Sequence, residues 1–361
     1  MRPLDAIERA RGLNQPLVGI DFTASDLRGP DLSGLVFQEC ALPGLDFTGT
    51  SLSGTSFSGC GLDGVRMAGA RLRSTTMAQC SLQAADFTGL VAEGVQFLEC
   101  DLSDSGWAAT RIERGTWMRC ALKGSDLADA RLYRCTFGQC RFERAVLRGA
   151  LLDSTALTDA DCRTARVERL QCTGAVLIDI GLAGQDLRTA RFHRTLMRGA
   201  DLSDADLRGA RITESSLQEA TLDGTRLDAV HAERTSFIEA TASRAVFDHA
   251  ALAGAVFHAA ALDACSFLGV QASGTSCTHA RVRDTTFAAA NLAHSDWAHA
   301  RILDGDFRRA RLTAANLHDL DTRGTSFRGS RQRHARGTDA ALLAAEARAL
   351  ELERPLWPWP T

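Results

Sequence analysis

The sequence predicts one elongated repeat solenoid. Apolar residues recur at every fifth position from Phe22 to Phe327, and the frame holds across 62 consecutive pentapeptides. All 16 phenylalanines lie on these central positions, and the residue two places earlier is usually Ala, Thr, Ser, Cys or Gly. An α-helix repeats every 3.6 residues and a strand every two, so neither explains a period of five. Short units repeated in register stack into one continuous core, which counts as a single domain.

The composition is that of a globular chain. Of the 361 residues, 45% are hydrophobic and 24% are charged, and the net charge is −3. This balance predicts neither general nucleic-acid binding nor attraction to a membrane surface. The first residues lack the apolar core of a signal peptide, and no run reaches transmembrane length. The 11 cysteines are odd in number and form no CxxC pair, so we expect a reduced, cytoplasmic chain.

The repeat unit is clearest in "ADLSDADLRGARI", from Ala200 to Ile212. The residue before each centre is often Asp or Arg, and the second residue after it is often Gly. This pattern resembles the A(D/N)LXX consensus of the pentapeptide-repeat family over about residues 17–330. The resemblance implies an all-β solenoid, a right-handed quadrilateral β-helix with four pentapeptides per coil and therefore about 15–16 coils. It also implies that the centre and the residue two places earlier point inward, while the other three positions face solvent.

The spacing of the cysteines follows from this geometry. Six of them are separated by 20 residues, which is one coil, and all six precede a centre by two places: Cys40, Cys60, Cys80, Cys100, Cys120 and Cys140. We expect one interior column with a rise of about 4.8 Å per coil. Parallel Cβ directions disfavour disulfides, and thiols that do not converge disfavour a metal site. The cysteines are therefore interpreted as small buried apolar residues.

Three segments are predicted. Residues 1–16 form an N-terminal cap containing a short helix, "PLDAIERARG", that ends at Gly12. Residues 17–330 form the β-helix. Residues 331–361 form a basic loop, a capping helix and a Trp/Pro tail. Thr338 or Asp339 is the expected N-cap of that helix and Pro355 its terminator. Its apolar residues are expected to lie over the last coil, because an open solenoid end invites aggregation: Leu342, Leu343, Ala347 and Leu350.

The tail is a separate candidate contact. Trp357 and Trp359 lie between prolines, so they cannot continue the helix. They are expected either to pack back on the chain or to contact a partner or a second copy. The resemblance also makes a homodimer through the C-terminal helix an open alternative.

No motif for catalysis is found. The chain has no GxSxG, P-loop or HExxH sequence, and an unbroken solenoid offers little pocket, so neither an enzyme nor a cofactor is predicted. Paired acids such as Asp201 and Asp206 are interpreted as backbone-binding or solvated groups. His279 and His299 are one coil apart, with Asp319 next in the column, and such a column could hold a metal. Exposed surface histidines are commoner, so no metal site is predicted.

Two adjacent faces differ in charge. The arginine face, centred on residues 32, 52, 72 and onward, carries more arginines than acids and is interpreted as a solvated face with local ion pairs. The acid–apolar face, centred on residues 37, 57, 77 and onward, carries more acids than arginines, together with outward apolar residues. Apolar residues grouped on one face suggest a binding surface, although single exposed apolar residues are ordinary. The candidate binding residues on it are Leu98, Glu99, Met118, Ile178, Leu196, Glu219, Ile238, Glu239 and Val256.

The sequence therefore favours a non-catalytic scaffold that presents a flat face to another protein. Family members found among bacterial secretion-system accessories fit this hypothesis. The alternative is a DNA mimic that binds DNA gyrase, like the quinolone-resistance members of the family. This chain departs from them in its small net charge, its basic face and its lack of loop insertions. Direct nucleic-acid binding by the arginine face and membrane binding are not expected.

Overall fold

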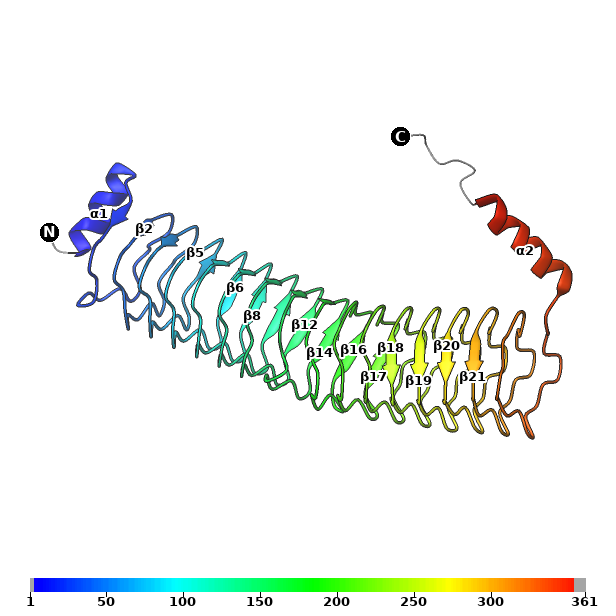
Figure 1. The fold of residues 1–361 in the computed structure, drawn as a ribbon. Helices are drawn as coiled ribbons and strands as arrows, with labels where there is room; N and C mark the ends of the chain where they lie inside the picture. Colours follow the sequence, from blue (N-terminus) through cyan, green and yellow to red (C-terminus); the bar gives the residue numbers. More distant parts are fainter. Residues whose placement is uncertain (1–2, 354–361) are drawn as a thin grey trace.

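The chain winds into a rod in which every coil-to-coil pairing joins residues 20 apart (Figure 1). The structure is a computed structural model that describes residues 3–353. Phe22 N–H donates to the carbonyl of Ala41, whose own N–H donates to the carbonyl of Ile20, and this arrangement repeats along the rod. Four ladders run lengthwise, and their first pairs are Leu17–Phe37, Asp21–Ala41, Asp31–Ser51 and Asp46–Arg66. Four ladders make four walls, so the predicted quadrilateral β-solenoid is confirmed.

Three of the walls contain parallel sheets of very short strands. The nine-stranded sheet consists of β1 (Leu17–Val18), β2 (Val36–Gln38), β3 (Ser56–Ser58), β5 (Thr76–Ala78), β7 (Gln96–Leu98), β9 (Thr116–Met118), β11 (Thr136–Gly138), β13 (Ala156–Thr158) and β15 (Val176–Ile178). The eight-stranded sheet consists of β4 (Leu72–Arg73), β6 (Val91–Glu93), β8 (Arg111–Glu113), β10 (Arg131–Tyr133), β12 (Leu151–Asp153), β14 (Gln171–Thr173), β16 (Arg191–His193) and β17 (Arg211–Thr213). The four-stranded sheet consists of β18 (Thr241–Ser243), β19 (Ala261–Asp263), β20 (Arg281–Arg283) and β21 (Arg301–Leu303).

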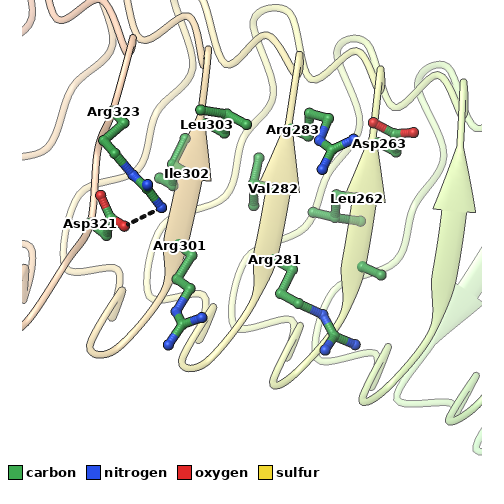
Figure 2. A pocket seen from close by; sticks show the side chains of 11 residues that line it. Leu262, Asp263, Arg281, Val282, Arg283, Arg301, Ile302, Leu303, Asp321 and Arg323 are labelled. Carbon is green, nitrogen blue, oxygen red and sulfur yellow. Dashed lines mark ion pairs between the residues drawn. The ribbon is translucent and has the colours of Figure 1, made fainter.

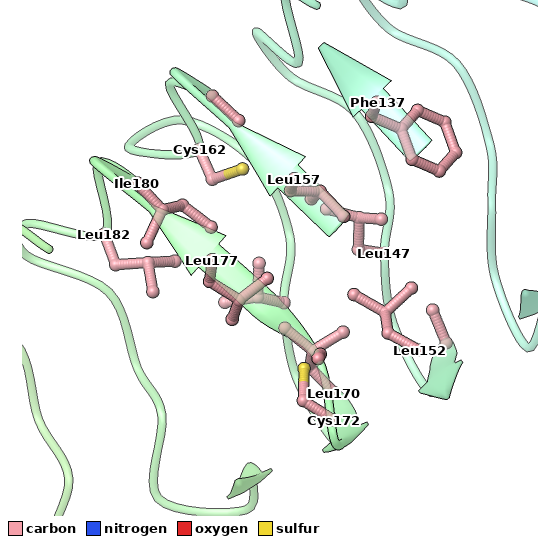
Figure 3. Packing of buried hydrophobic residues seen from close by; sticks show 14 of the residues in the cluster. Phe137, Leu147, Leu152, Leu157, Cys162, Leu170, Cys172, Leu177, Ile180 and Leu182 are labelled. Carbon is pink, nitrogen blue, oxygen red and sulfur yellow. The ribbon is translucent and has the colours of Figure 1, made fainter. Parts of the chain in front are cut away.

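Aromatic rings fill much of the interior. Rings on one wall stack coil upon coil, as in Phe247 on Phe267 with centroids 4.5 Å apart. Rings from the opposite wall meet them edge-on, as in Phe247 and Phe257 at 6.1 Å and 80°. Offset stacks and edge contacts are the favourable arrangements of aromatic pairs. In the middle of the rod, the labelled core residues other than Phe137 are aliphatic or cysteine, and Cys162 and Cys172 lie among leucines (Figure 3).

The cysteine column is also confirmed. All 11 cysteines are buried and free of disulfides. In the column each thiol donates to main-chain carbonyls, as Cys60 Sγ does to Phe37 O at 3.5 Å and to Ser58 O at 3.4 Å. The thiols therefore point along the wall toward backbone acceptors, and the 20-residue spacing follows from the coil geometry.

The corners of the coils require a left-handed backbone. The second residue after almost every centre has a positive φ, as in Gly64 at 66° and Glu99 at 54°. Glycine adopts this region without a steric penalty, which explains its frequency at this position in the repeat. Many corners nevertheless carry Asp, Glu or Arg, so charged side chains project from the edges of the rod.

The N-terminal end is covered by helix α1 (Pro3–Leu13), which runs one residue beyond the predicted stop at Gly12. Its residues Ala6, Ile7 and Ala10 are buried in the same core cluster as the first coil. The apolar side of α1 therefore closes the open end of the solenoid.

The C-terminal end differs from the prediction in two ways. Coil pairing does not stop near residue 330, because Arg331 N–H donates to Ala310 O at 2.8 Å and Arg336 N–H donates to Ala315 O at 2.9 Å. The expected basic loop is thus part of another coil, which forms through backbone hydrogen bonds without an apolar centre. Helix α2 (Ala340–Glu353) follows, with Asp339 as its N-cap: its Oδ1 accepts from the N–H groups of Ala341 and Leu342.

Helix α2 does not cover the last coil as expected. Leu342 is 48% exposed, Ala347 is exposed and Leu343 is half-buried. The side chain of Leu350 and residues Trp357 and Trp359 lie outside the described residues. Polar contacts of Glu346 with His318 and His299 attach the helix to the rod instead. In Figure 1, α2 extends away from the last coil. Within residues 3–353, no helix is long and apolar enough to cross a membrane.

Candidate protein-binding face

The acid–apolar face is the outer surface of the nine-stranded sheet and of the ladder that continues it. Each strand turns its middle residue inward and its two flanking residues outward, because side chains alternate along a strand. Leu98 on β7 therefore lies beside Ala78 on β5 and Met118 on β9. Consecutive outward residues form rows along the rod, which gives this wall a regular surface.

The six predicted apolar residues form three separate neighbouring pairs. Leu98 and Met118 are direct cross-strand partners. Ile178 is two residues from Val176, which pairs with Leu196 on the next coil. Ile238 is likewise two residues from Ser236, which pairs with Val256. The structure thus places residues from adjacent coils together, but it does not join the three pairs into one patch.

Most of these apolar side chains are covered in part by their neighbours. Leu196 is 49% exposed, whereas Leu98, Met118, Ile178, Ile238 and Val256 are half-buried. The most exposed large apolar side chain of the described solenoid is Val91, at 68%, and it lies on the arginine face. Sequence periodicity identifies which residues point outward, but not how far the residues of the next coil cover them.

The acids of the face lie at left-handed corners. Glu99, Glu219 and Glu239 are exposed and have φ values of 54°, 58° and 56°. Glu99 accepts hydrogen bonds from Arg119, which lower the pKa of its carboxyl group with help from Gln79. Glu219 accepts from Arg198 at 3.1 Å. Both arginines lie on this same face, so each partly neutralises one of its acids.

The arginine face also contains local ion pairs, as its interpretation required. Glu214 lies between Arg194, at 2.9 Å, and Arg234. Arg191 and Arg211 are direct cross-strand partners, a like-charge arrangement that sheets normally disfavour. A shallow depression of about 510 Å³ lies over this pair and is lined in part by Arg169 and Arg188.

The aspartates that precede the centres bind the backbone. Asp201 Oδ1 accepts the N–H of Ser203 at 3.1 Å, and Asp206 Oδ1 accepts the N–H of Arg208 at 3.2 Å. Of the two interpretations offered for these acids, backbone-binding or solvated groups, the structure shows the first. The Arg208 guanidinium also pairs with the same carboxylate, at 2.6 Å.

A second depression, of about 290 Å³, lies on the four-stranded sheet (Figure 2). Its floor consists of strands β19 to β21, whose middle residues Leu262, Val282 and Ile302 are buried. Arg281 and Arg301 stand along one side, and the other side carries the next row of outward residues. The depression is a feature of the outer wall between two rows of side chains, and it does not enter the core.

Sequence reasoning missed a cluster at the C-terminal end of the acid–apolar face. It singled out His279, His299 and Asp319, but the structure adds His318 and Glu346. His318 is 19 residues after His299, one position short of a full coil, so the repeat itself could have placed the two rings together. Glu346 belongs to α2, outside the repeat, and no periodic signal predicts its position.

Comparison with known protein families identifies the same repeats in this chain. A family model described as a pentapeptide repeat region matches residues 18–107, and a model described as pentapeptide repeats (8 copies) matches residues 125–161, 175–213 and 190–228. Together they cover half of the chain. No curated protein matches the sequence.

Comparison with solved structures gives three further matches. Trypsin-treated QnrB1, a plasmid-mediated fluoroquinolone resistance protein, is 19% identical over 50% of this chain and 90% of its own, with a TM-score of 0.31. HetL, a pentapeptide repeat protein involved in heterocyst differentiation regulation from the cyanobacterium Nostoc sp. strain PCC 7120, is 20% identical over 87% and 92%, with a TM-score of 0.21. The A-module of the Azotobacter vinelandii mannuronan C-5 epimerase AlgE4 is 10% identical over 93% and 92%, with a TM-score of 0.32.

Proposed function

Because the chain belongs to the pentapeptide-repeat family, we propose that it is a non-catalytic scaffold whose acid–apolar face binds a protein partner. The observation that carries the proposal is the placement of outward apolar residues on adjacent coils of one sheet. Leu98 and Met118 are side by side, and so are the coils that carry Ile178 and Leu196. Each pair offers a small apolar contact on a backbone that is already ordered.

A preformed surface favours binding because little conformational entropy is lost on association. The outward residues project from hydrogen-bonded ladders, so a partner need only order its own side chains. Apolar contacts would supply most of the affinity, with Leu196 exposing the largest fraction of its side chain among the candidates. The corner acids Glu99, Glu219 and Glu239 lie along the same face and would select a partner with a basic surface.

The proposal includes a second contact region at the C-terminal end. Leu342 on α2 is 48% exposed and is available to a partner or to a second copy of the chain. Trp357 and Trp359 follow on the same segment, so we include them as candidate contacts for a partner or for a homodimer.

The test is an affinity pull-down from extracts of the native host. Wild type is compared with a variant of the acid–apolar face that carries Leu98→Ser, Ile178→Ser, Leu196→Ser and Ile238→Ser. A matched control carries four exposed apolar residues of other walls changed in the same way: Val91→Ser, Tyr133→Ser, Leu268→Ser and Leu303→Ser. Size-exclusion chromatography and circular dichroism establish that all three proteins are folded.

The proposal expects a specific partner to be captured by wild type and by the control, and to be lost from the face variant. Retention of that partner by the face variant would show that the surface is ordinary. Loss from both folded variants would show that capture does not depend on the acid–apolar face in particular, which also contradicts the proposal. A further variant combines three substitutions: Glu99→Gln, Glu219→Gln and Glu239→Gln. It should weaken binding mainly at low salt, because salt screens the attraction between exposed charges.

A further inference from the structure

Four imidazole rings lie in contact along the C-terminal end of the acid–apolar face. His258 meets His279 edge-on at 5.3 Å, His279 stacks on His299 at 4.9 Å, and His299 meets His318 edge-on at 5.3 Å. His318 is almost fully buried, with 4% of its surface exposed.

Helix α2 adds a carboxylate to the end of this column. Glu346 Oε2 lies 3.2 Å from His318 Nε2 and 3.6 Å from His299 Nε2. The three donor atoms all lie within 4.8 Å of one another. In a tetrahedral zinc site with bonds of about 2.0–2.1 Å, neighbouring ligand atoms are roughly 3.3 Å apart. Two of the three separations are therefore already close to those of a coordinated ion.

His299 has the orientation expected of a metal ligand. Its Nδ1 lies 3.2 Å from Asp319 Oδ2, so the carboxylate holds the ring proton on Nδ1 and leaves the Nε2 lone pair facing Glu346. A carboxylate on the remote nitrogen is the usual support of a zinc-binding histidine. Two imidazoles and one carboxylate form a ligand set that suits zinc and leaves a fourth position for water or another ligand.

From these contacts we propose that His299, His318 and Glu346 bind one divalent transition-metal ion of the zinc class. The ion would join α2 to the last coils of the solenoid. Without an ion, the contacts between α2 and the rod in the described residues are mainly polar, because Leu342 and Ala347 are exposed. Coordination would replace the hydrogen bond between His318 and Glu346, and the 3.6 Å contact between Glu346 and His299, with bonds to the ion. These bonds would fix the helix against the end of the acid–apolar face.

A second hydrogen bond of His318 must also rearrange when the ion binds. His318 Nδ1 accepts the N–H of Asp339 at 3.1 Å, which places the ring proton on Nε2. Coordination through Nε2 moves that proton to Nδ1, so the Asp339 N–H has to turn away. Asp339 is exposed, and water can take over this hydrogen bond. Metal binding should therefore shift the Asp339 amide, which gives the proposal a local spectroscopic signature.

The test uses tag-free, full-length protein from which metal has been removed with EDTA. Calorimetry measures the binding of Zn²⁺ to this protein. Co²⁺ absorption reports tetrahedral coordination, and an amide NMR spectrum reports Asp339. The variants are Glu346→Gln and His299→Gln. His294→Gln is the matched control, because His294 and His299 both occupy left-handed corners with φ of 60°. Thermal melting in EDTA shows whether the variants fold as wild type does.

We expect wild type and His294→Gln to bind one Zn²⁺ per chain and to melt at a higher temperature with the ion. We expect Glu346→Gln and His299→Gln to weaken binding by more than about tenfold, since loss of only a partner of a ligand can have that effect. Failure of wild type to bind Zn²⁺ overturns the proposal. So does equal binding by Glu346→Gln and wild type, which would place the ion elsewhere.

Discussion

Glu99 and Arg119, one coil apart on the acid–apolar face, share two hydrogen bonds. The carboxylate Oε1 accepts both Nε–H, at 3.1 Å, and Nη2–H of the guanidinium, while Oε2 accepts from Gln79 at 3.0 Å. Glu219 and Arg198 repeat the arrangement farther along the rod. The acid columns of this face are thus interrupted by paired arginines, and the face does not present an unbroken line of negative charge.

This pairing leads to a prediction about DNA mimicry. A mimic of duplex DNA needs regularly spaced, uncompensated negative charge, because phosphate charge dominates the recognition of DNA. We expect no inhibition of purified DNA gyrase by the wild-type protein in a supercoiling assay, even in large molar excess. The double variant Arg119→Gln, Arg198→Gln leaves Glu99 and Glu219 without their arginine partners. It serves as the comparison protein, because its face carries more uncompensated negative charge. Inhibition by wild type near equimolar concentration would restore the gyrase hypothesis.

Much of the fold could be predicted because each position in a period-five repeat has a fixed direction. Phe37 and Cys60 are inward residues of the unit, and both are buried. Even the interpretation of Asp206 follows from its place before a centre, where the carboxylate reaches the N–H two residues ahead. Because the pentapeptide repeats without interruption, the direction of each side chain in one unit predicts its direction in every coil.

The remaining features depend on contacts that the repeat does not encode. Coil pairing at Arg331 is formed by backbone hydrogen bonds. The apolar centres end before this coil, so the repeat pattern did not predict it. The position of α2 depends on Glu346 meeting His318, two residues from different parts of the chain. The half-burial of Met118 depends on the side chains of the neighbouring coils. Long-range packing of individual side chains, rather than period, decides each of these cases.

Two buried tryptophans allow a sharp comparison of core polarity. Trp107 Nε1–H donates to Ser105 Oγ at 2.7 Å, whereas Trp117 Nε1–H is buried without a hydrogen-bond partner among the described residues. Trp117 has Gly115 at the corresponding position, where an added Cβ would lie 2.6 Å from the indole ring. We expect Trp107→Phe to lower the free energy of unfolding by about 1–2 kcal/mol through the lost hydrogen bond and lost volume.

Trp117→Phe should cost clearly less than Trp107→Phe, because it also removes an unsatisfied buried donor. Chemical denaturation of the two variants, followed by circular dichroism, makes the comparison. Trp297 provides an independent check, since its Nε1–H donates to Ser295 Oγ at 2.8 Å and Trp297→Phe should resemble Trp107→Phe. Equal losses for all three variants would mean that volume alone decides the outcome.

The thiols should be unreactive in the folded protein. Burial raises the pKa of Cys135 and of Cys265 to about 11, and only the thiolate is an effective nucleophile. We expect no labelling by iodoacetamide at pH 8 in native buffer, and labelling of all 11 cysteines after denaturation. Mass spectrometry of the intact protein counts the labels. Rapid native labelling at Cys60 or Cys80 would contradict the buried column.

The last prediction concerns acid stability and the aspartate–arginine pairs within single pentapeptides. Hydrogen bonds from the side chain and backbone of Arg188 lower the pKa of Asp186 to about 2. Because the folded pKa lies below the unfolded value, the pair stabilises the fold above about pH 4, and that contribution is lost as the pH falls toward 2. The pair is exposed, so we expect Asp186→Asn to cost well under about 1 kcal/mol at pH 7. The difference from wild type should vanish near pH 2 when unfolding is measured across this range.

Asp284→Asn is the control, since Asp284 is exposed and its carboxylate has no hydrogen bond or ion pair within the described residues. A difference at Asp186 that persists unchanged to pH 2 would assign its effect to the turn geometry rather than to charge.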